Sequence, residues 1–326
     1  MPGSVALGPL AAKLRGSRGL AAKSDIAGVA ARLALSADSA VPVGDDCAAI
    51  PDGDGYLLFA IEGFMNEFVE RDPWFAGWCG VMVNVSDVAA MGGRPIAIVD
   101  ALWAAGGEAA APLLEGLRAA AASYGVPIVG GHTNTRSDRS QLSVAILGRA
   151  KRLLTSFAAQ PRDRLIAAID LRGRYREPFS NWEAATVAPP ARLKADLEVL
   201  PGLAERGLVS AAKDISQAGL IGTVMMLAEC SRVGARIEIA CAPRPNEAPL
   251  ERWLQTFPSY GFILAVSQAD VPAVLARFHD RGIAAADVGE ITADPRVVLC
   301  DGASTETIWN FAQEPLLGCV EPKVPA

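Results

Sequence analysis

One predicted helix, running from Pro73 to about Met91, constrains the fold of this chain more than any other stretch. Asp72 can cap its start, proline suits the first helical position, and Gly92 followed by Pro95 can end it. Apolar side chains recur along it at spacings of three and four, at Trp74, Trp78, Val81, Met82, Val85 and Val88. One wide face of this helix is therefore apolar and suited to a core.

Two polar residues interrupt this apolar helix. Asn84 and Asp87 are three residues apart, so both stand on one side of it. Burying an amide without hydrogen-bonding partners costs roughly 2–7 kcal/mol, and burying a lone charge costs more. The pair is therefore either an exposed or internally hydrogen-bonded polar edge, or part of a metal or phosphate site.

Four short motifs, in order along the chain, carry a resemblance to a known family. They are Gly44-Asp-Asp46, Asn84-Val-Ser-Asp-Val-Ala-Ala-Met-Gly92, Gly130-Gly-His-Thr-Asn134 and Asp214-Ile-Ser-Gln-Ala-Gly-Leu220. Together they resemble the aminoimidazole ribonucleotide (AIR) synthetase superfamily, and they are most similar to its thiamine-monophosphate kinase branch. The resemblance implies a two-domain α+β fold. Its N-terminal mixed sheet with helices would form a dimer, and its C-terminal domain would be an α/β sandwich.

We predict an N-terminal domain over residues 1–150, for binding ATP and Mg²⁺ and for dimerisation, and a C-terminal α/β domain over residues 151–326. Residues 1–24 are basic and rich in Gly, Ala and Ser, which indicates a solvated arm. The resemblance adds an alternative, in which this arm folds over the nucleotide. A short amphipathic helix is expected over residues 25–36. Apolar strands that could pair two copies of the chain are expected at 56–61, 95–103 and 141–149.

Acidic residues in and near these motifs suit a hard cation, because Mg²⁺ takes oxygen ligands and usually bridges to phosphates. The predicted metal ligands are Asp45, Asp46, Glu62, Asp87 and Asp214. The residues that the resemblance implies for ATP binding are Gly44, Asn84, Gly130, Gly131, Thr133 and Ser216. Asp87, Asp214 and His132 are the predicted catalytic residues.

These residues also have structural alternatives. Asp45 and Asp46 can cap a turn. Asp214 follows a predicted strand and precedes a predicted helix, so it can cap that helix, although the same position also favours a phosphate and its cation. His132 follows two glycines in a predicted loop, where it can simply bond to the backbone.

This chain differs from the resembled kinase branch at four positions, which limits how much of the chemistry of that branch can be expected here. Glu62, Cys79, His132 and Gln217 stand where that branch has other residues. The leading hypothesis is therefore an ATP- and Mg²⁺-dependent enzyme that phosphorylates or phospho-activates a small metabolite. A thiamine-monophosphate kinase is the first alternative, and a non-catalytic nucleotide-binding partner of other enzymes is the second.

Composition limits the setting of this chemistry. A net charge of −6 argues against a general nucleic-acid binder. No apolar run approaches the roughly 20 residues needed to span a bilayer, so no membrane contact is expected. The six cysteines form no C-x-x-C pair and lie mostly in apolar runs, which favours buried thiols in a reducing compartment. We therefore expect a cytoplasmic protein that acts on a small molecule.

Overall fold

The computed structural model describes residues 5–33, 42 and 44–318, and the chain forms two compact units. Unit 1 comprises residues 1–45, 154–184 and 206–326, and unit 2 comprises residues 46–153 and 185–205. The described residues before Asp46 thus belong with the second half of the chain, and the segment 185–205 returns to unit 2.

Unit 2 is built on a five-stranded mixed sheet in the order β1-β2-β5-β3-β4. Only β3 and β4 pair in parallel, and the other neighbours are antiparallel. The strands are β1 (Ala48–Asp52), β2 (Gly55–Gly63), β3 (Arg94–Ala105), β4 (Ile128–Asn134) and β5 (Arg136–Ala150). This is the mixed sheet with helices that was predicted for the N-terminal half.

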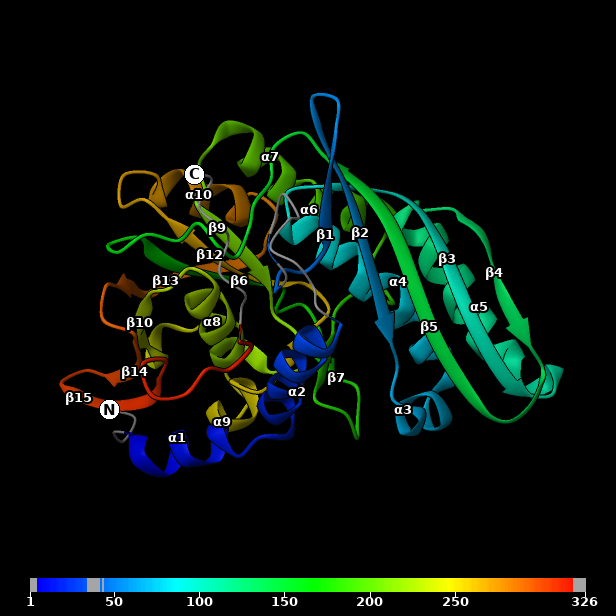
Figure 1. Cartoon of the computed structure of the whole chain (residues 1–326), viewed down its shortest axis with the longest axis horizontal. Coiled ribbons are helices and arrows are strands. Elements are labelled where there is room, and N and C mark those ends of the chain that lie inside the picture. Colours follow the sequence, from blue (N-terminus) through cyan, green and yellow to red (C-terminus); the bar gives the residue numbers. More distant parts are fainter. Residues whose placement is uncertain (1–4, 34–41, 43, 319–326) are drawn as a thin grey trace. The chain divides into compact units, whose positions relative to one another are not determined.

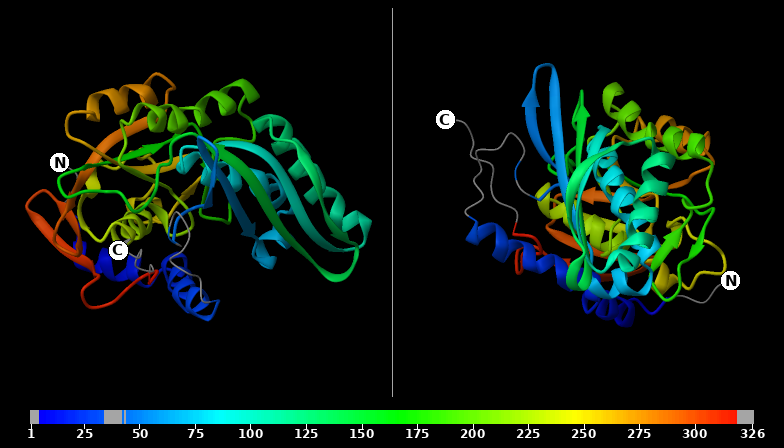
Figure 2. Two further views of the ribbon diagram at one scale, coloured as in Figure 1. Left: turned by 45° about the horizontal axis from the view of Figure 1, so that its top comes forward. Right: turned by 90° about the vertical axis from the view of Figure 1, so that its right-hand side faces the viewer.

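The predicted central helix is confirmed as α4 (Pro73–Ala90), and the carboxylate of Asp72 accepts a hydrogen bond from the Phe75 N–H at 3.2 Å. Helices α4 and α5 (Gly107–Tyr124) lie on one face of the sheet (Figures 1 and 2). They approach closely because Gly77 faces the backbone of Leu113, where a side chain would overlap it. Unit 2 also contains α3 (Asn66–Arg71), α6 (Pro190–Leu197) and most of α7 (Val199–Arg206).

The other face of this sheet exposes large apolar side chains. Ile61 is 65% exposed, Phe59 49% and Val99 40%. Strand register places these three side chains on one face, because Ala145 of β5 lies opposite both Ile61 and Val99. Ile50 of β1 is exposed on the same face. We call these four residues the apolar sheet face.

Unit 1 is built on a seven-stranded sheet in the order β15-β14-β10-β13-β6-β12-β9, with only β10 and β14 parallel. A second sheet of three short strands has the order β11-β8-β7. The strands of the large sheet are β6 (Arg164–Ile169), β9 (Ala211–Asp214), β10 (Gly234–Glu238), β12 (Gly261–Val266), β13 (Ala284–Thr292), β14 (Arg296–Asp301) and β15 (Ser304–Asn310). The short strands are β7 (Arg174–Tyr175), β8 (Asn181–Glu183) and β11 (Phe257–Pro258).

Helices cover both faces of the large sheet, as an α/β sandwich requires. Helices α1 (Leu7–Arg15) and α8 (Gly219–Cys230) pack into the core of one face, and α10 (Val271–His279) packs against β6 and β13 on the other. The remaining described helices of unit 1 are α2 (Arg18–Arg32), η1 (Ile239–Cys241) and α9 (Leu250–Trp253). None of the helices in the described ranges is long and apolar enough to cross a membrane.

The expectation of a solvated N-terminal arm is wrong for the described residues. Leu7, Leu10, Leu14 and Leu20 are buried in the core of unit 1, so the arm is a pair of packed helices. Lys13, Arg15 and Arg18 are exposed, and Lys13 pairs with Glu251 at 2.8 Å. The helix expected over 25–36 begins earlier, in α2, and its predicted end at 34–36 lies outside the described residues.

Candidate metal and nucleotide site

Helix α4 buries both of its polar residues. Asn84 and Asp87 are 0% and 4% exposed, so the exposed-edge alternative is wrong. The Asn84 side-chain amide donates to the backbone oxygens of Gly80 at 2.8 Å and Val144 at 3.1 Å. Its own oxygen, Oδ1, is buried and has no hydrogen-bonding partner among the described residues. Asn84 therefore fastens α4 to β5 and leaves an oxygen for a ligand.

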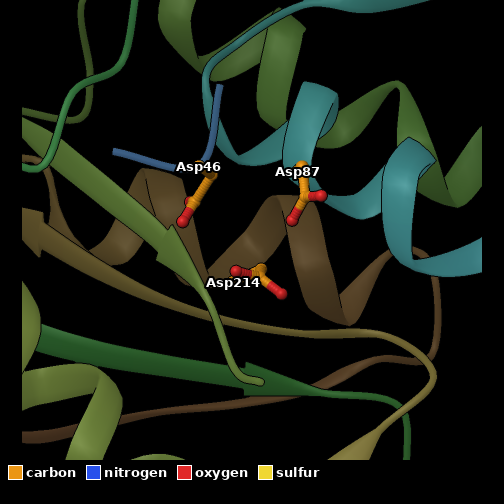
Figure 3. A group of neighbouring side chains, drawn as sticks. All are labelled: Asp46, Asp87 and Asp214. Carbon is orange, nitrogen blue, oxygen red and sulfur yellow. The ribbon is translucent and has the colours of Figure 1, made fainter. Parts of the chain in front are cut away.

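A second carboxylate of unit 2 lies near Asp87. Asp46 is half-buried, just before β1, and it follows Gly44, whose φ is 130°. One carboxylate oxygen of Asp46 lies within 4.8 Å of one from Asp87 (Figure 3). Two negative charges so close repel each other unless a cation lies between them. Oxygen donors in this arrangement suit a hard divalent ion.

Asp45 has a different role from its neighbour in the sequence. Its carboxylate accepts two hydrogen bonds from Ser156, from the backbone N–H at 2.9 Å and from the hydroxyl at 2.7 Å. Ser156 is fully buried in unit 1. The hydrogen bonds thus give Asp45, a predicted metal ligand, a structural role within unit 1.

Asp214 lies where it was predicted, at the last residue of β9 and before α8. Its side chain is buried, and its backbone oxygen accepts a hydrogen bond from the Thr223 hydroxyl at 3.4 Å. The capping alternative is wrong, because α8 begins at Gly219 with Ala218 at the cap position. Ser216 lies half-buried in the turn between them, where its carbonyl accepts the Gly219 N–H at 2.9 Å.

The glycine pair at 130–131 belongs to a strand, β4, and the expected loop is wrong. A side chain at Gly131 would lie 2.6 Å from the Asp100 carboxylate, whereas one at Gly130 would meet nothing within 4 Å. The closeness of Asp100 therefore explains why residue 131 is glycine, whereas no contact with the described residues requires glycine at residue 130. Burial raises the pKa of the Asp100 carboxyl above its ordinary value.

His132 also lies in β4, on the face of the sheet that α4 does not cover. Its register partner is Ala101, whose neighbour Leu102 is buried on the opposite, α4-covered face. The His132 ring is exposed and lies 5.7 Å from the Trp103 ring. Within one copy of unit 2, His132 and Asp87 are thus on opposite sides of the sheet. Thr133 follows His132 in β4 and is exposed.

Glu62 lies on the α4 side of the sheet. Glu62 in β2 lies opposite Val144 in β5, and the Val144 carbonyl accepts a hydrogen bond from the Asn84 side-chain amide. Lys213 was given no role from the sequence, yet it is buried beside Asp214 in β9. A lysine inside an otherwise apolar strand was the signal that could have singled it out.

Comparisons with known proteins agree with this fold. The family model described as "AIR synthase related protein, N-terminal domain" matches residues 44–150, and the corresponding C-terminal domain model matches residues 170–301. The protein sll0787 of Synechocystis is 47% identical over 281 residues, which cover 86% of this chain and 87% of that protein.

Two solved structures share the fold at low sequence identity. Thermotoga maritima PurL complexed with ADP has a TM-score of 0.74 and 20% identity, over 98% of this chain and 56% of that chain. AaThiL complexed with AMPPCP and TMP has a TM-score of 0.65 and 22% identity, over 85% of this chain and 93% of that chain. The predicted superfamily and its α+β fold are confirmed, and the chain belongs to the AIR synthase related protein family.

Proposed function

We propose that this chain is a cytoplasmic enzyme that uses ATP and Mg²⁺ to phosphorylate or phospho-activate a small metabolite. The observation that carries this proposal is a pair of aspartates in unit 2, Asp46 and Asp87. One carboxylate oxygen of Asp46 lies within 4.8 Å of one carboxylate oxygen of Asp87 (Figure 3). Oxygens that share one Mg²⁺ lie roughly 3–4 Å apart, because each is bound at about 2.1 Å. A small inward movement would let these residues hold one ion.

Each ligand has support from the element that carries it. Asp87 projects from a helix that is buried along nearly its whole length, so its position is rigid. Asn84 adds a buried oxygen with no other described partner. Asp214 stands just before α8, and the N-terminus of a helix favours a negatively charged phosphate. Glu62 lies on the same side of the sheet as α4, which carries Asp87, and it would act as an outer ligand of the metal ion.

Nucleotide binding is supported by the neighbours of this fold, which were solved with ADP and AMPPCP. We propose that Gly44, Gly130, Gly131, Thr133 and Ser216 contact the nucleotide. To catalyse phosphoryl transfer, a protein mainly positions the reactants and neutralises charge. The aspartates would hold Mg²⁺ for this purpose, and the N–H groups at the start of α8 would face the phosphate. The bound Mg²⁺ would neutralise the negative charge on the phosphate oxygens.

We also propose that two copies pair through the apolar sheet face. Ile50, Phe59, Ile61 and Val99 would be buried by a second copy, and twofold pairing is the commonest form of assembly. His132 and Trp103 are on the same face of the sheet. In a pair, His132 would therefore lie at the interface, where it can act with the second copy.

The test is calorimetric titration of Mn²⁺ and ADP into the wild type, Asp87→Asn and the control Asp138→Asn, which changes an exposed aspartate of unit 2. The proposal expects binding by the wild type and the control and loss of Mn²⁺ binding in Asp87→Asn. Equal Mn²⁺ binding by all three would reject the site.

ATP turnover with a library of metabolites then separates an enzyme from a non-catalytic nucleotide-binding protein. Adding thiamine monophosphate as one substrate tests the kinase alternative directly. ADP released only with thiamine monophosphate would identify that kinase, and binding without any turnover would favour the non-catalytic alternative.

A further inference from the structure

The N-terminal helix α2 rests directly on the turn that follows Asp214. A side chain at Gly19 would overlap the carbonyl oxygen of Gln217 and lie 2.8 Å from its carbonyl carbon. Only glycine lets the two backbones approach this closely. The next residue, Leu20, is buried, and its side chain reaches α8 near Gly222.

The far part of α2 is held by a second contact. A side chain at Gly318, whose φ is 62°, would lie 2.9 Å from the Cβ of Ala27 in α2. The segment that carries Gly318 is fixed by Glu229, near the end of α8. The Glu229 carboxylate accepts the N–H groups of Leu316 at 2.9 Å, Leu317 at 2.6 Å and Gly318 at 3.2 Å. Helix α2 thus lies beside α8 (Figure 1), and it makes close contacts at Gly19 and at Ala27.

The turn is also held from its other side. Gly219 has φ 67°, and a side chain there would lie 2.6 Å from the Cα of Gln255. The Ile215 N–H donates to the Gly261 carbonyl at 2.8 Å. The residues between Asp214 and α8 therefore lie between two backbone contacts made by glycine, at Gly19 and Gly219.

We propose that Gly19 is a positioning residue for the candidate site. Through Gly19, α2 presses on Gln217 and fixes the turn that connects Asp214 to the N-terminus of α8. Glu229 supports this from a distance, because it holds the segment against which α2 rests. The inference deepens the proposed function and rests on it, since the turn matters for ligands only if Asp214 and Ser216 bind them.

Gly19→Ala and Gly28→Ala form a matched pair in the same helix. Both replacements raise helix propensity by the same kind of change. A side chain at Gly28 would meet nothing within 4 Å, whereas one at Gly19 forces the turn to move. Glu229→Gln is the third variant, since it keeps the size of the side chain and removes the charge that binds three N–H groups.

Two measurements test the proposal at a temperature where all variants are folded. Hydrogen exchange of the amides of residues 215–222 should be faster in Gly19→Ala than in wild type or Gly28→Ala, without any ligand. Calorimetric ADP affinity in the presence of Mn²⁺ should fall roughly tenfold or more in Gly19→Ala, because small misplacements of binding groups are costly. Glu229→Gln should also speed exchange and lower ADP affinity, but both changes should be smaller than in Gly19→Ala.

The outcomes separate this inference from the proposed function. Unchanged exchange in Gly19→Ala and Glu229→Gln would overturn the positioning role, whatever binds. Faster exchange with wild-type ADP affinity would also overturn it, since the turn would then be structural only. A wild type that binds neither Mn²⁺ nor ADP would reject the proposed function, and with it the role of Gly19 toward a ligand. If Gly19→Ala does not fold, Glu229→Gln carries both measurements.

Discussion

The side-chain amide of Asn84 donates a hydrogen bond to the backbone oxygen of Val144, 60 residues further along the chain. This bond joins the middle of α4 to the middle of β5. It also orients the amide, because the nitrogen must face the two carbonyl oxygens and the oxygen must face away from them. The element that brings Asp87 to the site is therefore held by its own polar neighbour.

Asn84→Ala should destabilise the protein by about 1–3 kcal/mol, because two buried carbonyl oxygens lose their donor. Asn84→Asp should destabilise the metal-free protein more, since a carboxylate would then face those oxygens and stand three residues from Asp87. Urea unfolding without metal measures both. A smaller loss for Asn84→Asp than for Asn84→Ala would contradict the orientation of the amide.

Asp87→Asn should leave the metal-free protein as stable as wild type or slightly more stable. The substitution removes repulsion among close carboxylates, which is up to roughly 3 kcal/mol for two charges about 5 Å apart at an effective dielectric near 20. The rise in melting temperature on adding Mg-ATP should largely disappear. A structural carboxylate predicts the opposite pattern, a loss of roughly 3–5 kcal/mol in the metal-free protein with the ligand shift retained.

Asp45→Asn and Asp46→Asn should differ although the residues are adjacent. Asp45→Asn places an amide opposite one of the two Ser156 donors, so it should lower stability by about 1–3 kcal/mol and leave Mn²⁺ affinity unchanged. Asp46→Asn should lower Mn²⁺ affinity with little loss of metal-free stability. Thermal melting and Mn²⁺ titration of both variants check this, and a swap of the two results would place the metal at Asp45.

Ile61→Glu should break a pair of chains held through the apolar sheet face, because it places a charge among side chains that the second copy would bury. Leu114→Glu is the control, since Leu114 is exposed on α5 and lies outside that face. Sedimentation of wild type, Ile61→Glu and Leu114→Glu at micromolar concentration measures the outcome. A monomeric wild type would remove the proposal of a dimer.

Asp100→Asn should stabilise the protein at pH 7 and have little effect below pH 3.8. Burial raises the pKa of the Asp100 carboxyl in the folded state above its ordinary value of 3.8. Below the ordinary value the carboxyl is neutral in both states, and as pH rises through the folded pKa the native protein must carry a partly buried charge. Calorimetric melting at pH 7 and at a pH below 3.8 checks this, with Asp138→Asn as the control. Equal effects at both pH values would show that charge is not the cause.

Local signals predicted those parts of the fold that depend on neighbours in the sequence. Asp72, Pro73 and the apolar spacing placed α4, and the change from an apolar run to polar residues placed Asp214 at the end of β9. The residues that determine both features lie within about one helical turn or one strand of them in the sequence.

The parts that were wrong depend on distant residues. The N-terminal residues were interpreted by their charge, whereas the spacing of Leu7, Leu10 and Leu14 matters because a distant sheet buries them. Gly130 and Gly131 suggested a loop, but pairing with β3 makes them a strand. Asp45 and Asp46 could not be distinguished, because the partner of Asp45 lies 111 residues away.

The chain passes between its two units four times, at residues 45–46, 153–154, 184–185 and 205–206. No single cut can therefore yield two self-sufficient fragments. A fragment ending at residue 150 would carry α1 without β14 and β15 and α2 without α8, the elements against which they pack, and it would lack α6. Synthesis on the ribosome has the same consequence: the leucines of α1 emerge nearly 300 residues before β14 and β15, the strands that cover them.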